Sequence, residues 1–210
     1  MARGQIVILN GAPRSGKSSI VDAIQESFDG PWMNLGVDVH VRSVTPARFR
    51  PGIGLRPGGE RPDLELLVPT FYAALYESVA AHSRLGLNVV VDVGHHDAGR
   101  PPAKILADCA RRLAGLPVLF VGVRCPIEVI MERRDAGQAG REGQYLLSAA
   151  DGSAPNEVHL WQREVHRPGI YDLEVDTSLL SPEACAAVIR RRLDDSAEEP
   201  MAFQRLALPF

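Results

Sequence analysis

Apolar residues along the chain form short continuous runs, and longer segments with helical spacing lie between them. The first run, Gln5–Asn10, contains four consecutive apolar residues, which is typical of a strand that is buried on both faces of a parallel sheet. Similar runs predict four further strands, at Trp32–Val37, Asn88–Val93, Pro117–Val123 and Tyr171–Val175.

The segments between the strands carry apolar residues at intervals of three and four. Ile20, Ile24 and Phe28, for example, would share one face of a helix. Helices are predicted at Ser18–Phe28, Leu64–Leu85, Ala103–Leu113, Ile127–Arg134 and Pro182–Leu193. Because strands and helices alternate throughout, the pattern predicts an open, doubly wound parallel α/β sheet, flanked by helices, in a single domain of 210 residues.

Three segments lack this periodicity. Arg48–Arg61 is dense in Pro, Gly and Arg, which predicts a surface loop, and Ala136–Gly143 loses all apolar spacing. We expect a substrate loop at about 42–63, a lid at about 134–160 and a C-terminal tail at 194–210. The acidic start of this tail is expected to be solvated, whereas four apolar residues near its end can pack back on the domain: Phe203, Leu206, Leu208 and Phe210.

Composition gives no electrostatic reason for binding nucleic acid or an anionic membrane. The net charge is −3, and no apolar run approaches the roughly 20 residues that span a bilayer. The three cysteines lie far apart, so neither a disulfide framework nor a C-x-x-C metal site is expected. The first residues do not resemble a secretory signal. We therefore expect a cytoplasmic protein without nucleic-acid or membrane partners, and the sequence leaves a homo-oligomer open.

A phosphate-binding signature follows the first strand. Residues 11–18, Gly-Ala-Pro-Arg-Ser-Gly-Lys-Ser, match the pattern G-x-x-x-x-G-K-[S/T] without a mismatch. Glycine lets main-chain N–H groups converge on phosphate oxygens, and the helix that begins near Lys17 directs its positive end at them. An ordinary glycine turn is the alternative, but Lys17 is one of only two lysines in the chain. The residues expected to bind ATP in this P-loop are Gly11, Ala12, Pro13, Arg14, Ser15, Gly16, Lys17, Ser18 and Ser19.

An acidic residue at the end of the Asn88–Val93 run is the second part of the site. Asp92 closes a run of three valines, and it would face the P-loop across the carboxyl edge of the sheet. Ser18 and Asp92 are therefore expected to hold Mg²⁺, while Lys17 reaches the β- and γ-phosphates. The alternative is that Asp92 caps the turn after the strand.

A second acid, Asp38, follows the Trp32–Val37 run near the edge where substrates enter such sheets. A small-molecule kinase needs a group that accepts the proton of the acceptor hydroxyl and aims its oxygen at the γ-phosphate. Asp38 is the best-placed acid for this task. On position alone, an N-cap of the next helix is an equal alternative.

Three arginines near the predicted lid form the fourth part, because guanidinium groups can stabilise the charge of a phosphoryl group in transfer. Arg133 and Arg141 are the leading candidates, ahead of Arg134. A solvated helix end is the alternative for each of them.

With these parts in order, the chain resembles the chloramphenicol phosphotransferase-like family of P-loop kinases from Ile6 to about Leu193. The segments that carry the resemblance are Ile8-Leu9-Asn10-Gly11, Pro31-Trp32, Gly36-Val37-Asp38, the strand ending at Asp92, Val121-Gly122-Val123-Arg124-Cys125 with Arg133 eight residues later, Tyr171-Asp172, and Glu174-Val175-Asp176-Thr177.

The resemblance implies a nucleoside-kinase-like P-loop fold and an ATP-dependent O-phosphotransferase, with a small hydroxylated molecule as substrate and antibiotic resistance as one role. It implies that Asp38 is the base and that Arg133 and Arg141 clamp the phosphates. His95 and His96 follow Asp92 where the family carries a hydrophobic patch, which leaves the acceptor open.

Two other functions remain open. A zeta-toxin-like kinase that phosphorylates a nucleotide sugar would use the same P-loop, and an arginine-rich loop would meet its diphosphate. A solvated loop is the simpler interpretation of those arginines, which are Arg42, Arg48, Arg50, Arg56 and Arg61. A regulator that binds ATP without transferring phosphate would need neither Asp38 nor the lid arginines.

Overall fold

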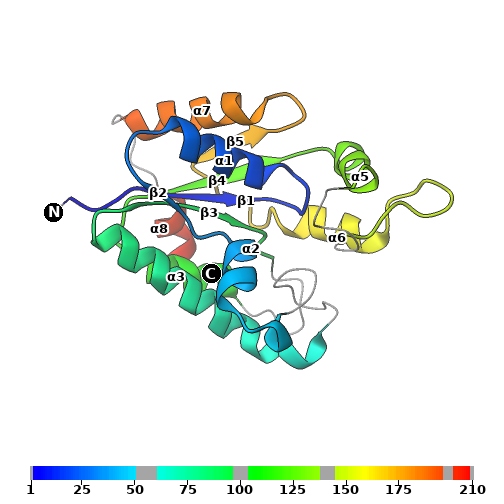
Figure 1. Cartoon of the computed structure of the whole chain (residues 1–210), viewed down its shortest axis with the longest axis horizontal. Coiled ribbons are helices and arrows are strands. Elements are labelled where there is room, and N and C mark those ends of the chain that lie inside the picture. Colours follow the sequence, from blue (N-terminus) through cyan, green and yellow to red (C-terminus); the bar gives the residue numbers. More distant parts are fainter. Residues whose placement is uncertain (1, 51–60, 97–103, 138–144, 196–200, 209–210) are drawn as a thin grey trace.

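The structure, a computed structural model, describes residues 2–50, 61–96, 104–137, 145–195 and 201–208, in which strands and helices alternate (Figure 1). The strands are β1 (Ile6–Asn10), β2 (Trp32–Asn34), β3 (Asn88–Val93), β4 (Val118–Arg124) and β5 (Leu173–Asp176). The longer helices are α1 (Lys17–Ser27), α3 (Val68–Arg84), α4 (Ile105–Arg112), α5 (Ile127–Asp135), α6 (Asn156–Glu164) and α7 (Pro182–Asp194). The shorter ones are α2 (Val37–Val39), η1 (His40–Val44), η2 (Ala47–Phe49), η3 (Pro62–Leu67) and α8 (Ala202–Ala207).

The strands form one parallel sheet in the order β2-β3-β1-β4-β5. β1 lies at its centre, where Leu9 is opposite Asp92 of β3 and Val121 of β4. Because each pair is parallel, the carboxyl ends of the strands meet at one edge of the sheet. This confirms the predicted doubly wound parallel fold.

Helices cover both faces of the sheet, because the central strand is apolar at consecutive positions. Ile6 and Ile8 of β1 pack in a cluster with α3, α4 and α8, whereas Val7 and Leu9 pack with α1 and α7 on the opposite face (Figure 1). All four side chains are fully buried. Among the described residues, no helix is both long and apolar enough to cross a bilayer.

A smaller apolar cluster lies under α5 and α6, and we call it the lid-base cluster. It joins Ala12 of the P-loop to Ile130 of α5 and Val158 of α6. The P-loop is therefore packed directly against the elements on which the predicted lid is built. Each of the three clusters contains one buried free cysteine. Cys109 lies in the cluster with α3, α4 and α8, Cys185 in the cluster with α1 and α7, and Cys125 in the lid-base cluster.

Several element boundaries differ from those predicted. β2 ends at Asn34, because Gly36 and Val37 begin the short helix α2. The predicted helix from Leu64 begins as the 3₁₀ turn η3, and α3 starts only at Val68, with a proline in its first turn. β5 starts two residues later than predicted and ends at Asp176.

The sequence pattern does not predict α6, because Val158 is its only buried residue and one apolar contact leaves little helical periodicity. The predicted surface loop Arg48–Arg61 begins within η2 and is followed by η3, and its residues 51–60 lie outside the described part of the chain. Residues 138–144 of the predicted lid also lie outside it.

The end of the chain packs under the sheet, as two of its apolar residues predict. Phe203 of α8 meets Phe120 of β4 edge to face, with ring centroids 5.0 Å apart, and is stacked 6.4 Å from Tyr76 of α3. Leu206 is buried as well, whereas Leu208 is exposed and Phe210 lies outside the described residues.

Removing the Phe203 ring should therefore destabilise the whole domain. We expect Phe203→Ala to lower the free energy of unfolding by about 3–5 kcal/mol, the usual loss for a large buried aromatic residue. Leu208→Ala, a matched change in the same tail, should stay within about 0.5 kcal/mol because Leu208 is exposed. Urea unfolding measures both, and equal effects would show that α8 is not part of the core.

Candidate active site

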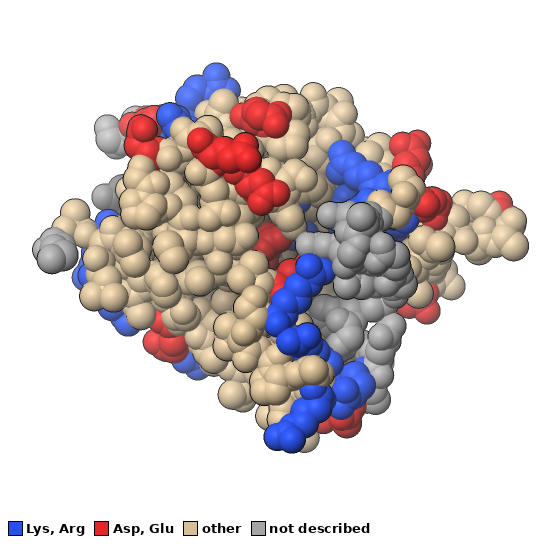
Figure 2. Space-filling model, viewed as in Figure 1, with Lys and Arg blue, Asp and Glu red and all other residues tan. Residues whose placement is uncertain are grey.

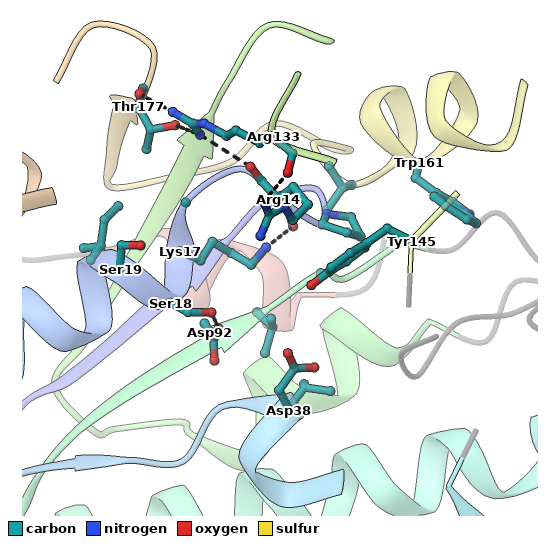
Figure 3. A pocket seen from close by; sticks show the side chains of 18 of the residues that line it. Arg14, Lys17, Ser18, Ser19, Asp38, Asp92, Arg133, Tyr145, Trp161 and Thr177 are labelled. Atoms are coloured by element: carbon teal, nitrogen blue, oxygen red, sulfur yellow. Dashed lines mark hydrogen bonds between the residues drawn. The ribbon is translucent and has the colours of Figure 1, made fainter. Parts of the chain in front are cut away.

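A cavity of about 510 Å³ opens at the carboxyl edge of the sheet (Figure 3). Its wall comes from the P-loop, from α2, from the end of β3 and from the lid elements around α5 and α6. Of the nine residues predicted to bind nucleotide, seven line the cavity, and the side chains of Ala12 and Ser15 are buried. The structure therefore gathers the predicted phosphate-binding loop around one hollow.

The shape of the P-loop depends on two glycines. Gly16 has φ 89°, a left-handed conformation that favours glycine, and a Cβ on Gly11 would lie 2.5 Å from the carbonyl oxygen of Val123. The Nζ of Lys17 donates to the carbonyls of Gly11 and Ala12, at 2.8 Å each. This amine is thereby held over the loop at the N-terminus of α1, where an anion is favoured.

Ser18 and Asp92 meet across the cavity floor. The Ser18 hydroxyl donates to Asp92 Oδ2 at 2.9 Å, which brings α1 and β3 together (Figure 3). The other oxygen, Oδ1, occupies space beside Gly36, where an added Cβ would lie only 1.7 Å away. Gly36 is therefore required for Asp92 to reach Ser18.

The Ser18–Asp92 pair fits a magnesium site of the kinase type. Mg²⁺ prefers oxygen ligands and is usually held by one or two carboxylates together with substrate phosphates and water. Among the described residues, no group of three or more His, Cys, Asp or Glu side chains could form a complete protein cage for a metal. A hydroxyl and a carboxylate beside the P-loop are a suitable donor set for a cation that arrives with a nucleotide.

Asp38 lies in the first turn of α2 and lines the same cavity, on the side opposite Lys17 (Figure 3). Tyr72 of α3 is close by: burial raises the pKa of its phenol well above the usual value, and Cys109 and Asp38 act in the same direction. Tyr72 therefore keeps its proton at neutral pH and can serve as a hydrogen-bond donor on the wall near Asp38.

Arg133 extends from α5 into a network of backbone and hydroxyl oxygens. Its guanidinium donates to Thr177 at the carbonyl (2.8 Å) and at Oγ1 (3.1 Å), and more weakly to the Arg14 carbonyl at 3.4 Å. Arg133 thus joins α5, the P-loop and the loop after β5 while it lines the cavity. Arg141, the other predicted phosphate clamp, lies outside the described residues.

The two adjacent histidines have different environments. His95 is buried and shares a 2.7 Å hydrogen bond with the Tyr76 hydroxyl, and its main-chain N–H donates to Asn10 Oδ1 at 2.8 Å. Burial lowers the pKa of His95 to about 3, and the neighbouring His96 adds to the effect, so His95 is neutral at pH 7. His96 instead lines the same cavity as the candidate base Asp38.

The sequence analysis did not identify the aromatic part of the cavity wall. Tyr145 and Trp161 line the lid side, and Tyr72 lines the α3 side. Tyr72 lies within the predicted helix Leu64–Leu85, but nothing in its spacing distinguishes a cavity residue from a core residue. Tyr145 and Trp161 belong to the segment in which α6 was not predicted, and their separation in sequence carries no signal.

Comparison with known proteins agrees with this geometry. The family model of chloramphenicol phosphotransferase-like proteins matches residues 4–194, nearly the whole chain. The chain belongs to this family. Its curated relatives include a Mycobacterium tuberculosis protein named "Putative O-phosphotransferase", which is 27% identical over 233 residues, with 100% of this chain and 91% of the relative covered.

Solved structures support the same fold for this chloramphenicol phosphotransferase-like protein. The APS kinase CysC of Mycobacterium tuberculosis, in complex with AMPPNP and APS, matches with a TM-score of 0.59 and 20% identity over 93% of this chain and 100% of its own. A gluconokinase from Sinorhizobium meliloti matches with a TM-score of 0.53 and 19% identity, over 99% of this chain and 95% of its own. Shikimate kinase from Aquifex aeolicus matches with a TM-score of 0.52 and 18% identity, over 90% of this chain and 96% of its own. Fold and family together identify a phosphotransferase of the kinase type.

The close approach of Gly36 to Asp92 leads to a specific prediction. A methyl group at position 36 must displace the Asp92 carboxylate, so Gly36→Ala should weaken Mg²⁺-dependent binding of an ATP analogue by about 10- to 100-fold, the usual effect of changing a group that orients a metal ligand. Calorimetric titration with and without Mg²⁺ measures this. The matched control is Val39→Ala, at an exposed position in α2. If Mg²⁺ increased the affinity for the ATP analogue equally in both variants, the prediction would be contradicted.

The buried His95 leads to a prediction about pH. Its pKa in the fold lies below the ordinary 6.5, so below pH 6.5 only the unfolded chain gains this proton, and stability falls as pH falls. His95→Gln should remove this contribution, which is at most about 1.4 kcal/mol per pH unit. Urea unfolding between pH 7.5 and 5 measures the slope of the free energy of unfolding against pH. An exposed control, His159→Gln, should keep the wild-type slope, and an equally steep slope for His95→Gln would exclude the proposed cause.

Proposed function

We propose that this protein transfers the γ-phosphate of ATP to a hydroxyl group of a small molecule, with Mg²⁺ as cofactor. The observation that carries the proposal is the meeting of three kinds of group in one cavity: the phosphate-binding loop with Lys17, the Ser18–Asp92 pair, and Asp38 across from them. A site that only bound nucleotide would need the first two kinds and not the third. Membership of the chloramphenicol phosphotransferase-like family supports the same reaction.

On the donor side, the main-chain amides of the P-loop would hold the β- and γ-phosphates, and Lys17 would pair with their oxygens. In the structure its amine is held by two loop carbonyls, which keeps it beside the space for the phosphates. Ser18 and Asp92 would supply oxygen ligands to Mg²⁺, and the cation, when bound, neutralises charge on the phosphate oxygens. Arg133 of α5 and Arg141 of the predicted lid would add positive charge beside the phosphates.

On the acceptor side, Asp38 would accept the proton of the substrate hydroxyl and direct its oxygen toward the γ-phosphate. Tyr72 can donate a hydrogen bond to the same substrate, and the aromatic rings of Tyr145 and Trp161 offer apolar contact. The acceptor is therefore expected to carry a hydroxyl next to an apolar or aromatic portion. The segment 42–63, which follows α2 in the chain, would be the substrate loop.

A nucleotide sugar as acceptor would require free arginines in that loop. Figure 2 shows basic side chains gathered beside the segment from η1 to η2, where Arg42, Arg48 and Arg50 are exposed. Arg50, however, donates to the carbonyls of Thr45 and Arg42, at 3.0 and 2.7 Å. Arg61 likewise pairs with Asp63 in the next turn, and Arg56 lies outside the described residues. These bonds of Arg50 and Arg61 stabilise the loop itself, so these two arginines give no specific support for a diphosphate-bearing acceptor.

Replacing the candidate base tests the proposal. Asp38→Asn keeps the shape of the side chain but cannot accept a proton, so transfer should fall by about 10²- to 10⁴-fold while ATP binding stays nearly unchanged. Transfer of radiolabelled phosphate from ATP to a panel of hydroxylated metabolites and antibiotics measures the first quantity, and calorimetry measures the second.

Asp29→Asn, a matched change at an exposed aspartate after α1, should transfer phosphate as the wild type does. Wild-type transfer by Asp38→Asn would remove Asp38 from the role of base. ATP binding without transfer to any acceptor in the panel, including chloramphenicol and UDP-sugars, would favour a nucleotide-binding regulator instead.

A further inference from the structure

Arg14 has a backbone conformation that its residue type does not favour. Within the P-loop it adopts φ 73°, in the left-handed region, where glycine is the ordinary residue. Glycine at this position would keep the main-chain N–H for phosphate and would avoid the strain. The presence of arginine therefore indicates that the side chain has a task that the loop backbone does not perform.

The Arg14 side chain leaves the P-loop and reaches the lid. Its Nη2 donates to the carbonyl oxygen of Arg133 in the last turn of α5 (Figure 3). It also donates to the carbonyl of Gly137, two residues beyond the end of α5, at 3.1 Å. A cation is favoured there because the helix dipole is negative at this end. The same guanidinium lies 5.5 Å from the ring centroid of Tyr145, within the range of a cation–π contact.

A second arginine continues this contact into α6. The guanidinium of Arg134 lies 5.6 Å from the Tyr145 ring and 5.9 Å from the Trp161 ring. It is almost fully buried and donates to the Leu146 carbonyl at 3.2 Å. Arg14, Tyr145, Arg134 and Trp161 thus form one alternating series of cations and rings, which we call the Arg–aromatic chain.

The charges in the Arg–aromatic chain respond to an anion at the P-loop. Two guanidinium groups that share one ring repel each other, and burial, with Arg14 as a further cause, lowers the pKa of Arg134 to about 10. The phosphates of a bound nucleotide would add negative charge beside Arg14 and reduce this repulsion. Nucleotide binding should therefore tighten the contacts that hold Tyr145 and Trp161.

We infer that Arg14 is a positioning residue that couples occupation of the P-loop by a nucleoside triphosphate to the placement of Tyr145 and Trp161, the lid side chains that form one wall of the acceptor cavity. The acceptor would then bind best after the nucleotide. The inference rests on the proposed function only in that the P-loop binds phosphates. The lid-base cluster around Ala12 does not include Arg14, so α5 and α6 should stay packed on the P-loop without this side chain.

Trp161 supplies a direct readout. The other tryptophan, Trp32, is buried in the α1/α7 face against Phe28, and Trp32→Phe leaves Trp161 as the single reporter. In this background, AMP-PNP with Mg²⁺ should reduce quenching of Trp161 by acrylamide. In Arg14→Gly, which keeps the main-chain N–H of the P-loop, that reduction should be lost even at AMP-PNP concentrations that saturate the site.

Two variants at Tyr145 test the Arg–aromatic chain without touching the P-loop. Tyr145→Leu should also lose the response of Trp161 to nucleotide, whereas Tyr145→Phe, which keeps the ring, should retain it. With an acceptor identified, Arg14→Gly should raise the acceptor KM more than the ATP KM. An unchanged Trp161 response in Arg14→Gly or Tyr145→Leu would overturn the inference.

Loss of AMP-PNP binding in Arg14→Gly would also overturn it, because Arg14 would then be a phosphate ligand. These measurements need no phosphate transfer. A protein with the Trp161 response but no transfer to any alcohol would refute the proposed function and leave the coupling intact. Phosphate transfer without a Trp161 response would refute the coupling and leave the proposed function intact.

Discussion

The contact between Asp92 and the bare Cα of Gly36 is the constraint around which the site is arranged. An added Cβ at Gly36 would lie 1.7 Å from Asp92 Oδ1, while the other carboxylate oxygen is bonded to Ser18. Because Gly36 also begins α2, the same short turn positions Asp38. The P-loop side and the α2 side of the cavity are therefore fixed to each other through one close approach of main chain and carboxylate.

Local sequence predicts those parts of the site that local geometry determines. The sequence predicts the P-loop because its glycines and Lys17 follow one another in a pattern with a physical reason at each position, and the structure places this loop at the cavity before α1. The parallel sheet was predicted because consecutive apolar residues in β1 require helices on both faces. Asp38 and Asp92 were singled out because they follow strands, and both line the cavity.

Contacts between distant segments were not predictable in the same way. The guanidinium of Arg14 bonds to a carbonyl 119 residues away, and no spacing rule relates these positions. Tyr145 and Trp161 form a cavity wall only because α6 folds over the P-loop, and α6 has too few buried residues to show helical periodicity. The P-loop part of the cavity is thus encoded in a short motif, whereas its aromatic wall depends on tertiary packing.

The distribution of the buried cysteines gives each part of the core its own chemical reporter. Cys109 lies in the cluster under α3, Cys185 in the cluster under α1 and α7, and Cys125 in the lid-base cluster. A buried thiol reacts with a reagent only when its surroundings open, so the reaction rate of each cysteine reports the local opening of one cluster. Retaining one cysteine at a time would separate breathing of the lid base from unfolding of either sheet face, without any added label.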